Sequence, residues 1–355
     1  MSGSSLDGVD AVLAAARGTR TRLLEHVYLP YPAALKKYLL SLHDEGKDEL
    51  HRAALLANGL SDIYAKAVRR LLARARVRAR AVAAIGCHGQ TVRHRPDAGY
   101  TVQLVNGARL AEQTGIPVIC DFRSRDIAAG GQGAPLVPAY HDAMFGGRRG
   151  GCVIVNVGGI ANVTRLPARG TVTGFDSGPG NCLLDGWIML KRRLPFDTGG
   201  AWSRRGRVVP RLLGRLLAHP YFRRQPPKST GRDAFGLAWL QRALTGAERP
   251  VDVQATLLEL TAVTIARAID AHCAGIRDVF VCGGGARNRE LLRRLAELMP
   301  RKRVATTTQL GIGPEHVEAL AFAWLARQAL RHRAGNLPAV TGARGPRVLG
   351  AIYPA

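Results

Sequence analysis

The chain has 355 residues, of which 46% are hydrophobic and 22% are charged. A chain of this length and composition can bury a substantial core, and it is typical of a folded globular protein with two domains. It contains no apolar run of about 18 residues, and its N-terminus lacks a basic segment followed by an apolar one. These features argue against a membrane span and a signal peptide, and they favour a cytoplasmic protein.

The formal net charge is +25, with 51 basic and 26 acidic residues. Such a balance suits a nucleic-acid partner, because basic side chains neutralise phosphates. The arginines are, however, spread along the chain, and the basic run at 69–80 carries no interleaved aromatic residues for base stacking. We therefore predict no nucleic-acid partner and interpret the run as a solvated helix face.

The six cysteines contain no CxxC pair, and most of them lie in apolar runs. This pattern predicts buried thiols in a reducing compartment, not disulfides or zinc ligands. They are Cys87, Cys120, Cys152, Cys182, Cys273 and Cys282.

Hydrophobic periodicity divides the first part of the chain into elements. Residues 1–80 hold two helical stretches, the second at 48–75, where apolar residues recur every three or four positions. A buried strand then ends at Gly86. The following segments predict strands at 99–105 and 116–122, with a glycine-closed helix at 108–115 between them. This alternation indicates parallel α/β layers.

The segment GGRRGG at 146–151 resembles an interdomain linker, and the pattern restarts after it. A strand, glycine turn and strand cover 151–166, and strand, glycine loop and helix follow at 172–190 and again at 277–300. We predict domains at 1–146 and 147–355, with a C-terminal segment that can return to the first domain. Two similar halves would then face one cleft lined by their glycine loops.

Four glycine-rich segments, at 3–8, 156–162, 176–181 and 282–288, follow or precede apolar strands. Backbone amides in such segments approach phosphate at low steric cost. One such loop is more often structural than functional, but four favour a nucleotide cleft. Neither GxxxxGK[ST] nor GxGxxG occurs, so amides and a carboxylate-held metal must meet the phosphate charge. The available carboxylates are Asp7, Asp10 and Asp176.

Asp176 lies between a predicted strand and the glycine loop at 177–181. A carboxylate there would face the loop amides, where a general base or a metal ligand is useful for phosphoryl transfer. The structural alternative is that Asp176 caps the helix that follows.

A second polar cluster comprises residues 87–91 and 121–126. Arg123 and Arg125 could fork a substrate carboxylate, or they could pair with Asp121 and Asp126 as ordinary ion pairs. His88 could be a base or a satisfied histidine near a strand end.

Eight segments together resemble one family, the anhydro-N-acetylmuramic acid kinases of the actin, heat-shock ATPase and sugar kinase superfamily. The resemblance covers essentially the whole chain in the family's order. It implies two similar actin-like ATPase (ribonuclease H-like) α/β domains around a central nucleotide cleft, and a homodimer. The segments are 3–10, 86–94, 114–138, 155–164, 174–185, 226–236, 281–291 and 311–326.

The resemblance also implies a reaction. ATP and water open the 1,6-anhydro bridge of anhydro-N-acetylmuramic acid while its 6-oxygen is phosphorylated, giving N-acetylmuramic acid 6-phosphate and ADP in cell-wall recycling. Asp176 would be the base that activates the water. Magnesium is expected, and its protein ligands are not assigned.

By the same resemblance, the first phosphate loop is Gly3, Ser4, Ser5, Leu6, Asp7, Gly8, Val9 and Asp10. Gly158 and Gly159 lie opposite it. Gly283, Gly284 and Gly285 lie near the adenosine, and Glu318 is a candidate for the nucleotide side. The substrate residues would be Gln90, Asp121, Arg123 and Arg125, with an arginine binding the lactyl carboxylate.

Two departures from the family pattern concern the first loop. Ser4 replaces the family's usual threonine and keeps the hydroxyl. The apolar lead-in strand is missing, which predicts a true start upstream of Met1, because the neighbours of a lost central strand would have unpaired backbone groups.

Three alternatives stay open at this point. The chain could be a related sugar kinase that phosphorylates an ordinary hydroxyl. It could be an ATP-binding regulator or inactive homologue that moves without chemistry. A nucleic-acid binder is the third.

Overall fold

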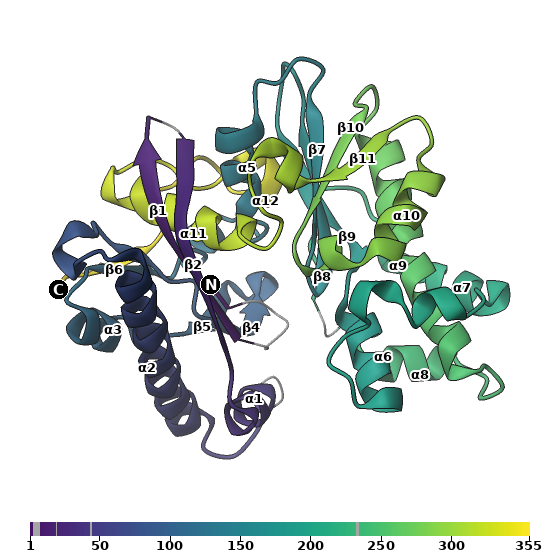
Figure 1. Cartoon of the computed structure of the whole chain (residues 1–355), viewed down its shortest axis with the longest axis horizontal. Helices are drawn as coiled ribbons and strands as arrows, with labels where there is room; N and C mark the ends of the chain where they lie inside the picture. The colour runs from purple at the N-terminus through teal and green to yellow at the C-terminus, as the bar shows by residue number, and fades with distance from the viewer. Residues whose placement is uncertain (3–7, 19, 43–44, 232–233) are drawn as a thin grey trace. The chain divides into compact units, whose positions relative to one another are not determined.

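The computed structural model describes residues 1–2, 8–18, 20–42, 45–231 and 234–355. The chain divides into two compact units, one of Met1–Met144 with His316–Ala355 and one of Phe145–Glu315. The division lies next to the predicted linker at 146–151. The yellow C-terminal helix α11 (Val317–Leu330) packs against the purple strand β1 (Gly8–Arg17) of the first unit (Figure 1).

The second unit is built on a five-stranded sheet in the order β11-β10-β7-β8-β9 (Figure 1). β7, β8 and β9 form an antiparallel meander, and β10 pairs in parallel with both β7 and β11. This is the strand order of a ribonuclease H-like domain. The strands are β7 (Cys152–Val157), β8 (Ile160–Leu166), β9 (Thr173–Pro179), β10 (Asp278–Cys282) and β11 (Arg303–Thr306).

The central strands of this sheet are buried because helices pack over them. Every residue of β7 is buried, and so are four of the five residues of β10, as expected for parallel strands with both faces covered. The long helix α9 packs on β8 and β9 and contributes apolar residues to the same core as these strands. The helices are α6 (Cys182–Arg192), α7 (Pro210–Leu217), α8 (Leu237–Ala243), α9 (Pro250–His272) and α10 (Arg289–Leu298).

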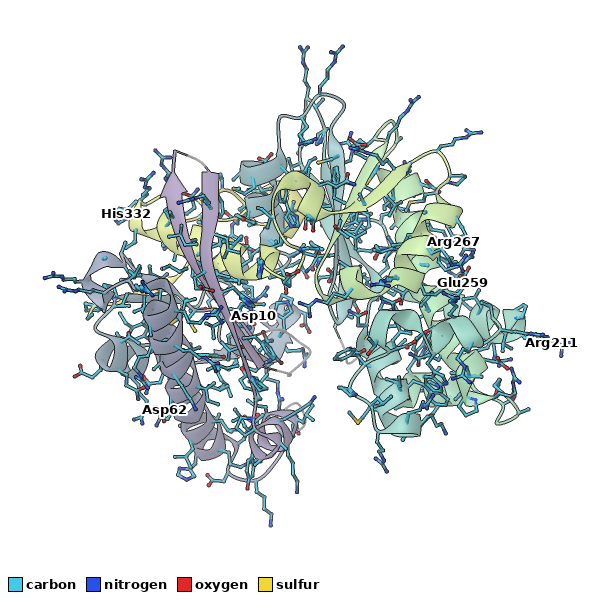
Figure 2. The ribbon with its side chains drawn as sticks, in the orientation of Figure 1. Asp10, Asp62, Arg211, Glu259, Arg267 and His332 are labelled. Carbon is cyan, nitrogen blue, oxygen red and sulfur yellow. The ribbon has the colours of Figure 1, made fainter. Side chains whose placement is uncertain are left out.

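α9 and α10 are also joined by a forked ion pair. Glu259, labelled in Figure 2, accepts hydrogen bonds from Nε and Nη2 of Arg294, each at 2.8 Å. Both side chains are largely buried, so the pair is less screened by water than a surface ion pair.

The described strands of the first unit form three separate ladders. β1 pairs with β2 (Arg20–Pro30) in a hairpin, and β4 (Gln90–Arg95) pairs antiparallel with β5 (Tyr100–Leu104). The third ladder has the order β12-β6-β3, with β3 parallel and β12 antiparallel to β6. Its strands are β3 (Ile85–Gly86), β6 (Val118–Cys120) and β12 (Ala351–Tyr353).

Helices cover these ladders. The predicted helix at 48–75 is confirmed as α2, and the predicted helix at 108–115 as α3, which ends at the left-handed Gly115. Asp62 on α2 (Figure 2) accepts hydrogen bonds from Arg109 Nε at 2.7 Å and Gln113 Nε2 at 2.5 Å on α3. The helices of this unit besides α11 are α1 (Ala33–Leu40), α2 (Glu49–Ala75), α3 (Gly107–Thr114), α4 (Ser124–Ala128), α5 (Val137–Phe145) and α12 (Pro338–Thr341).

Three strands of the first unit differ from the sequence prediction. β2, β4 and β12 were not predicted, and two of the ladders are antiparallel where parallel layers were expected. β2 carries an alternating pattern, since Val27 and Leu29 are buried while Tyr28 between them is exposed. That period of two is a strand signal that the sequence contained.

The cysteine prediction is confirmed. Five cysteines are buried thiols and Cys182 is a half-buried thiol. Among the described residues, no helix combines the length and the apolar composition needed to cross a membrane.

Candidate functional site

Three of the four predicted glycine segments meet at one edge of the five-stranded sheet in the second unit. Gly158 and Gly159 form the turn between β7 and β8. The carbonyl of Gly159 accepts from the amides of Gly180 at 2.9 Å and Cys182 at 3.1 Å, and that of Gly158 accepts from the Asn181 amide at 2.8 Å. The turn and the start of α6 are therefore one hydrogen-bonded piece, and these three amides donate within the protein.

The third segment of this edge, Gly283–Gly285, packs against the end of β7. Gly283 has φ +79°, and a Cβ there would lie 2.4 Å from Asn156 Oδ1. A Cβ on Gly285 would lie 2.3 Å from Val157 Cγ1. Gly284 between them is exposed. Gly283 and Gly285 leave no room for a side chain, and Gly283 also has a left-handed backbone conformation that favours glycine. The backbone of Gly284 is exposed to solvent.

Asp176 lies within β9, opposite Asn162 on β8, and only 7% of it is exposed. The predicted position of Asp176 after the strand is wrong, because β9 continues to Pro179. The alternative that Asp176 caps α6 is wrong as well, because Asn181 occupies the N-cap.

The segment 221–230 holds Asp176 through three hydrogen bonds. The Thr230 amide donates to Asp176 Oδ2 at 3.0 Å, and the Tyr221 hydroxyl donates to the Asp176 carbonyl at 2.8 Å. The Asp176 amide donates to the Lys228 carbonyl at 3.1 Å. Hydrogen bonds thus hold one carboxylate oxygen of Asp176 and both its main-chain amide and its main-chain carbonyl.

Sequence reasoning missed the functional meaning of this segment. Residues 226–236 were part of the family resemblance, but no residue in them had an assigned role. The signal was the run PPKSTG, whose lysine and small hydroxyl residues fold back onto β9.

In the first unit, Gly8, Val9 and Asp10 open β1. Asp10 Oδ1 lies 3.0 Å from His26 Nε2 on β2 (Figure 2), and Val9 is buried. Gly3, Ser4, Ser5, Leu6 and Asp7, predicted as the rest of the phosphate loop, lie outside the described residues.

Glu318, in the first turn of α11, belongs to the same unit as Asp10. Burial lowers the pKa of the Met1 α-amino group, and the negative charges nearby, including Asp10 and Glu318, oppose that shift. Both carboxylates therefore lie near enough to the Met1 amino group for their charges to act on it. The adenosine-side glycines proposed with Glu318 belong to the second unit.

Arg123 is fixed by His88 and by a loop carbonyl. Its Nε and Nη2 donate to His88 Nε2 at 3.1 and 2.9 Å, and its Nη1 donates to the Gly133 carbonyl at 2.7 Å. His88 Nδ1 lies 2.8 Å from the Gly89 carbonyl. Burial and the Arg123 charge hold the pKa of His88 well below its usual range. A neutral His88 whose Nε2 accepts from Arg123 is a support for that arginine and a poor base.

The other predicted substrate residues have different surroundings. Gln90, at the start of β4, is buried. Asp121 is exposed and accepts from the Ser124 amide at 3.3 Å and its hydroxyl at 2.5 Å, at the start of α4. Arg125 is exposed on α4. The structure thus joins Arg123 to His88, while Asp121 and Arg125 are exposed on the same segment.

Asp126 does not form the predicted ion pair. It is buried and accepts from the Gly133 amide at 2.8 Å, Asn336 Nδ2 at 2.7 Å and the Thr341 hydroxyl at 2.8 Å. It ties the loop after α4 to the C-terminal segment of the same unit.

No group of three or more His, Cys, Asp or Glu residues suited to a metal occurs in the part of the chain that the structure describes. Magnesium in phosphoryl-transfer enzymes is held by one or two carboxylates together with substrate phosphates, so its binding does not need such a group.

A family comparison defines the class of protein. The sequence model described as "Anhydro-N-acetylmuramic acid kinase" matches residues 1–355. The match places this α/β protein among the kinases, enzymes that transfer a phosphoryl group. More narrowly, the chain belongs to the anhydro-N-acetylmuramic acid kinase family, and the predicted family, fold class and enzyme class are confirmed.

Curated relatives agree with the family model. The relative from Nitrosomonas europaea is 53% identical over 357 residues, covering 100% of this chain and 98% of its own. Those from Thiobacillus denitrificans and Chromobacterium violaceum are each 54% identical over 359 residues, covering 100% of this chain and 96% and 98% of their own. All three are named anhydro-N-acetylmuramic acid kinase.

Solved structures are more distant. A ROK family glucokinase from Streptomyces griseus in complex with glucose and AMPPNP is 15% identical, with a TM-score of 0.40, over 86% of this chain and 93% of that chain. The (R)-2-hydroxyglutaryl-CoA dehydratase component A of Acidaminococcus fermentans is 10% identical, with a TM-score of 0.44, over 89% of this chain and 96% of that chain. These likenesses add nothing to the family assignment.

Proposed function

We propose that the protein transfers the γ-phosphoryl group of ATP to the 6-oxygen of 1,6-anhydro-N-acetylmuramic acid while water opens the anhydro bridge. The products are N-acetylmuramic acid 6-phosphate and ADP. This reaction belongs to peptidoglycan recycling and amino-sugar catabolism. The observation that carries the proposal is Asp176, a buried carboxylate fixed beside the glycine segments of the second unit.

In the proposed reaction, Asp176 accepts a proton from the attacking water. The water oxygen bonds to the anomeric carbon as the bond from that carbon to the 6-oxygen breaks. The 6-oxygen in turn takes the γ-phosphoryl group, and the bond to the β-phosphate breaks to release ADP. Phosphoryl transfer of this kind depends on positioning and charge neutralisation, and Asp176 needs no large movement because Thr230 already orients one of its oxygens.

The nucleotide roles follow the family motif. Gly3 to Asp10 form the first phosphate loop in this proposal, with Gly158 and Gly159 as the second. Gly283, Gly284 and Gly285 border the adenosine, and the exposed backbone of Gly284 supports that role. Magnesium supplies charge neutralisation on the phosphates when it is bound. Asp10 and Glu318, whose charges both act on the Met1 amino group, are the carboxylates of the first unit proposed as protein ligands of that ion.

Among the residues proposed to bind the substrate, Arg123 has the strongest structural support. A guanidinium held at Nε, Nη1 and Nη2 keeps a fixed plane, which suits forked recognition of the lactyl carboxylate. Gln90, which is buried at the start of β4, would bind a polar group of the sugar. Asp121 and Arg125 are proposed as outer contacts, since both are exposed.

The test compares Asp176→Asn with wild type on anhydro-N-acetylmuramic acid and ATP in ¹⁸O-labelled water. Wild type is expected to place the label at the anomeric position of the phosphorylated product. The variant should lose at least 100-fold in rate, about the contribution of a general base, while still binding ATP. Asp270→Asn, an exposed aspartate of α9, is the matched control. More than a few per cent of the wild-type rate in Asp176→Asn would remove Asp176 from the role of base.

A parallel assay with open-chain hexosamines distinguishes the ordinary sugar kinases. If these were phosphorylated as fast as the anhydro sugar, the ring-opening reaction would be the wrong assignment.

We further propose a homodimer, which the family resemblance implies, and a location in the cytoplasm, which the sequence features of the chain favour. Sedimentation equilibrium over a range of protein concentrations measures the first. Fractionation of producing cells measures the second.

A further inference from the structure

Lys228 lies in the segment 226–236 of the family resemblance, from which the proposed reaction uses the Thr230 amide and leaves the lysine without a role. Its side chain is half-buried, and its Nζ lies 4.9 Å from the centre of the Tyr221 ring and 5.8 Å from that of Phe175. Nζ also makes a long hydrogen bond of 3.5 Å to the Tyr221 carbonyl. A lysine ammonium is strongly hydrated in water, so a site on two aromatic faces costs part of that hydration.

The main chain and the side chain of Lys228 both converge on Asp176. The Lys228 carbonyl accepts from the Asp176 amide, and the two rings under its ammonium belong to Phe175, the preceding residue of β9, and Tyr221, whose hydroxyl holds the Asp176 carbonyl. Burial lowers the pKa of Lys228, and the Asp176 carboxylate opposes that change. The ammonium is thus close enough to Asp176 for its charge to matter.

We propose that Lys228 is a positioning residue for Asp176, with its ring-held ammonium supplying the positive charge beside the carboxylate and its main chain anchoring that part of β9. The inference rests on the proposed role of Asp176 as the base. A neighbouring cation favours the ionised carboxylate, which is the form that can accept a proton from water.

Other charged and titratable groups surround the pair. Arg224 and Tyr221 lie on the segment 220–224, and His272 lies at the end of α9 with its ring centre 5.0 Å from that of Phe175. Burial and Lys228 lower the pKa of His272, and Arg224 acts on Lys228 as a like charge. A pH experiment must therefore separate Asp176 from His272.

The test uses Lys228→Met, which removes the charge but keeps the main-chain bond and most of the stem. Rates are measured with saturating ATP and anhydro sugar over pH. We expect an acid limb of the rate profile moved upward by about one pH unit, which is about a tenfold loss of rate on the acid side of the wild-type limb. Lys228→Arg keeps the positive charge, so the acid limb of its rate profile should lie at the wild-type position. His272→Gln should leave the limb in place.

Lys191→Met is the matched control, because Lys191 Nζ also lies over an aromatic ring, 4.7 Å from that of Trp187, in the same unit. It should behave as wild type. Thermal unfolding of each variant checks that the unit folds.

Two results would overturn the inference. One is a Lys228→Met variant with wild-type rates, and the other is a loss that is equal at every pH with the acid limb unmoved, which would mark a structural role only. The Asp176→Asn variant is assayed alongside. Activity in Asp176→Asn contradicts the proposed function, whereas an inactive Asp176→Asn with an unmoved limb in Lys228→Met contradicts only the role of Lys228.

Discussion

Arg123 and His88 are joined by two hydrogen bonds to one atom, since Nε and Nη2 of the arginine both donate to His88 Nε2, at 3.1 and 2.9 Å. An arginine has no acceptor, so His88 Nε2 carries no proton. The ring proton is then on Nδ1 and is donated to the Gly89 carbonyl. In this tautomer, the role of His88 is to hold the guanidinium of Arg123 in place.

The first prediction concerns that guanidinium. Arg123→Lys removes the planar fork but keeps a positive charge. We expect KM for the anhydro sugar to rise by about 10- to 100-fold, with little change in KM for ATP, because forked contacts to a carboxylate contribute about 1.5–3 kcal/mol. Steady-state kinetics with each substrate varied in turn measures this. Arg125→Lys, at an exposed position of α4, is the comparison. An unchanged sugar KM in Arg123→Lys would exclude Arg123 from the substrate site.

The second prediction separates two neighbouring glycines. Gly283→Ala should destabilise the protein by about 1–3 kcal/mol, because a Cβ would lie 2.4 Å from Asn156 Oδ1 at a φ of +79°. Gly284→Ala should leave stability unchanged, since the nearest atom to its Cβ would be 3.7 Å away. If these glycines border the adenosine, Gly284→Ala raises KM for ATP while the unfolding midpoint stays constant. Urea unfolding and ATP kinetics give the two readings, and equal stability of both variants would contradict the packing argument.

The third prediction concerns the buried carboxylate of Asp126. Asp126→Asn turns one acceptor oxygen into a donor that faces other donors, from Gly133, Asn336 and Thr341. We expect a loss of about 1–3 kcal/mol in the free energy of unfolding. The control is Asp97→Asn, whose carboxylate is 67% exposed in its pair with Arg95, and which should leave the free energy of unfolding unchanged. Similar losses of unfolding free energy in Asp126→Asn and Asp97→Asn would mean that the buried hydrogen bonds of Asp126 do not stabilise the protein.

The fourth prediction is a pH dependence. Burial lowers the pKa of His141 to about 3 from an ordinary value of 6.5. The unfolded chain therefore binds a proton at this site below about pH 6.5 while the folded chain does not, so stability is complete above pH 6.5 and falls as the pH falls toward 3. At pH 5 the loss from this group is about 2 kcal/mol. Urea unfolding at pH 7 and pH 5 should show a smaller difference between the two pH values in His141→Gln than in wild type. An equal difference would exclude His141 as the source.

Much of the second unit could be predicted from sequence because its strands and helices carry strong local signals. The runs at 152–157 and 278–282 are largely apolar and are followed by glycine, and the structure has strands at both places. The position of Asp176 within β9 could not be predicted, because SGP looks like a loop and becomes strand only by pairing with β8. Tertiary pairing overrides the local preference there.

The first unit was harder because one of its three ladders, β12-β6-β3, joins segments that are distant in sequence. β3 has only two residues, and β12 pairs with β6 from the other end of the unit. Arg123 and Asp176 are also held by residues that are distant in sequence or by main-chain groups. A sequence motif does not show such contacts. His88 lies 35 residues from Arg123, and the Thr230 amide lies 54 residues from Asp176.

Because the C-terminal segment belongs to the first unit, the two units are completed in a fixed order during synthesis of the chain. The second unit is one continuous stretch, so all of its strands leave the ribosome before α11 and β12 are made. The first unit must wait, because Phe322 of α11 packs on His88 with ring centres 4.7 Å apart, and Ile352 pairs with Ile119. During synthesis the nascent chain should therefore pass through a stage with the later unit folded and the earlier one open, in which chaperones would find the apolar face that α11 later covers.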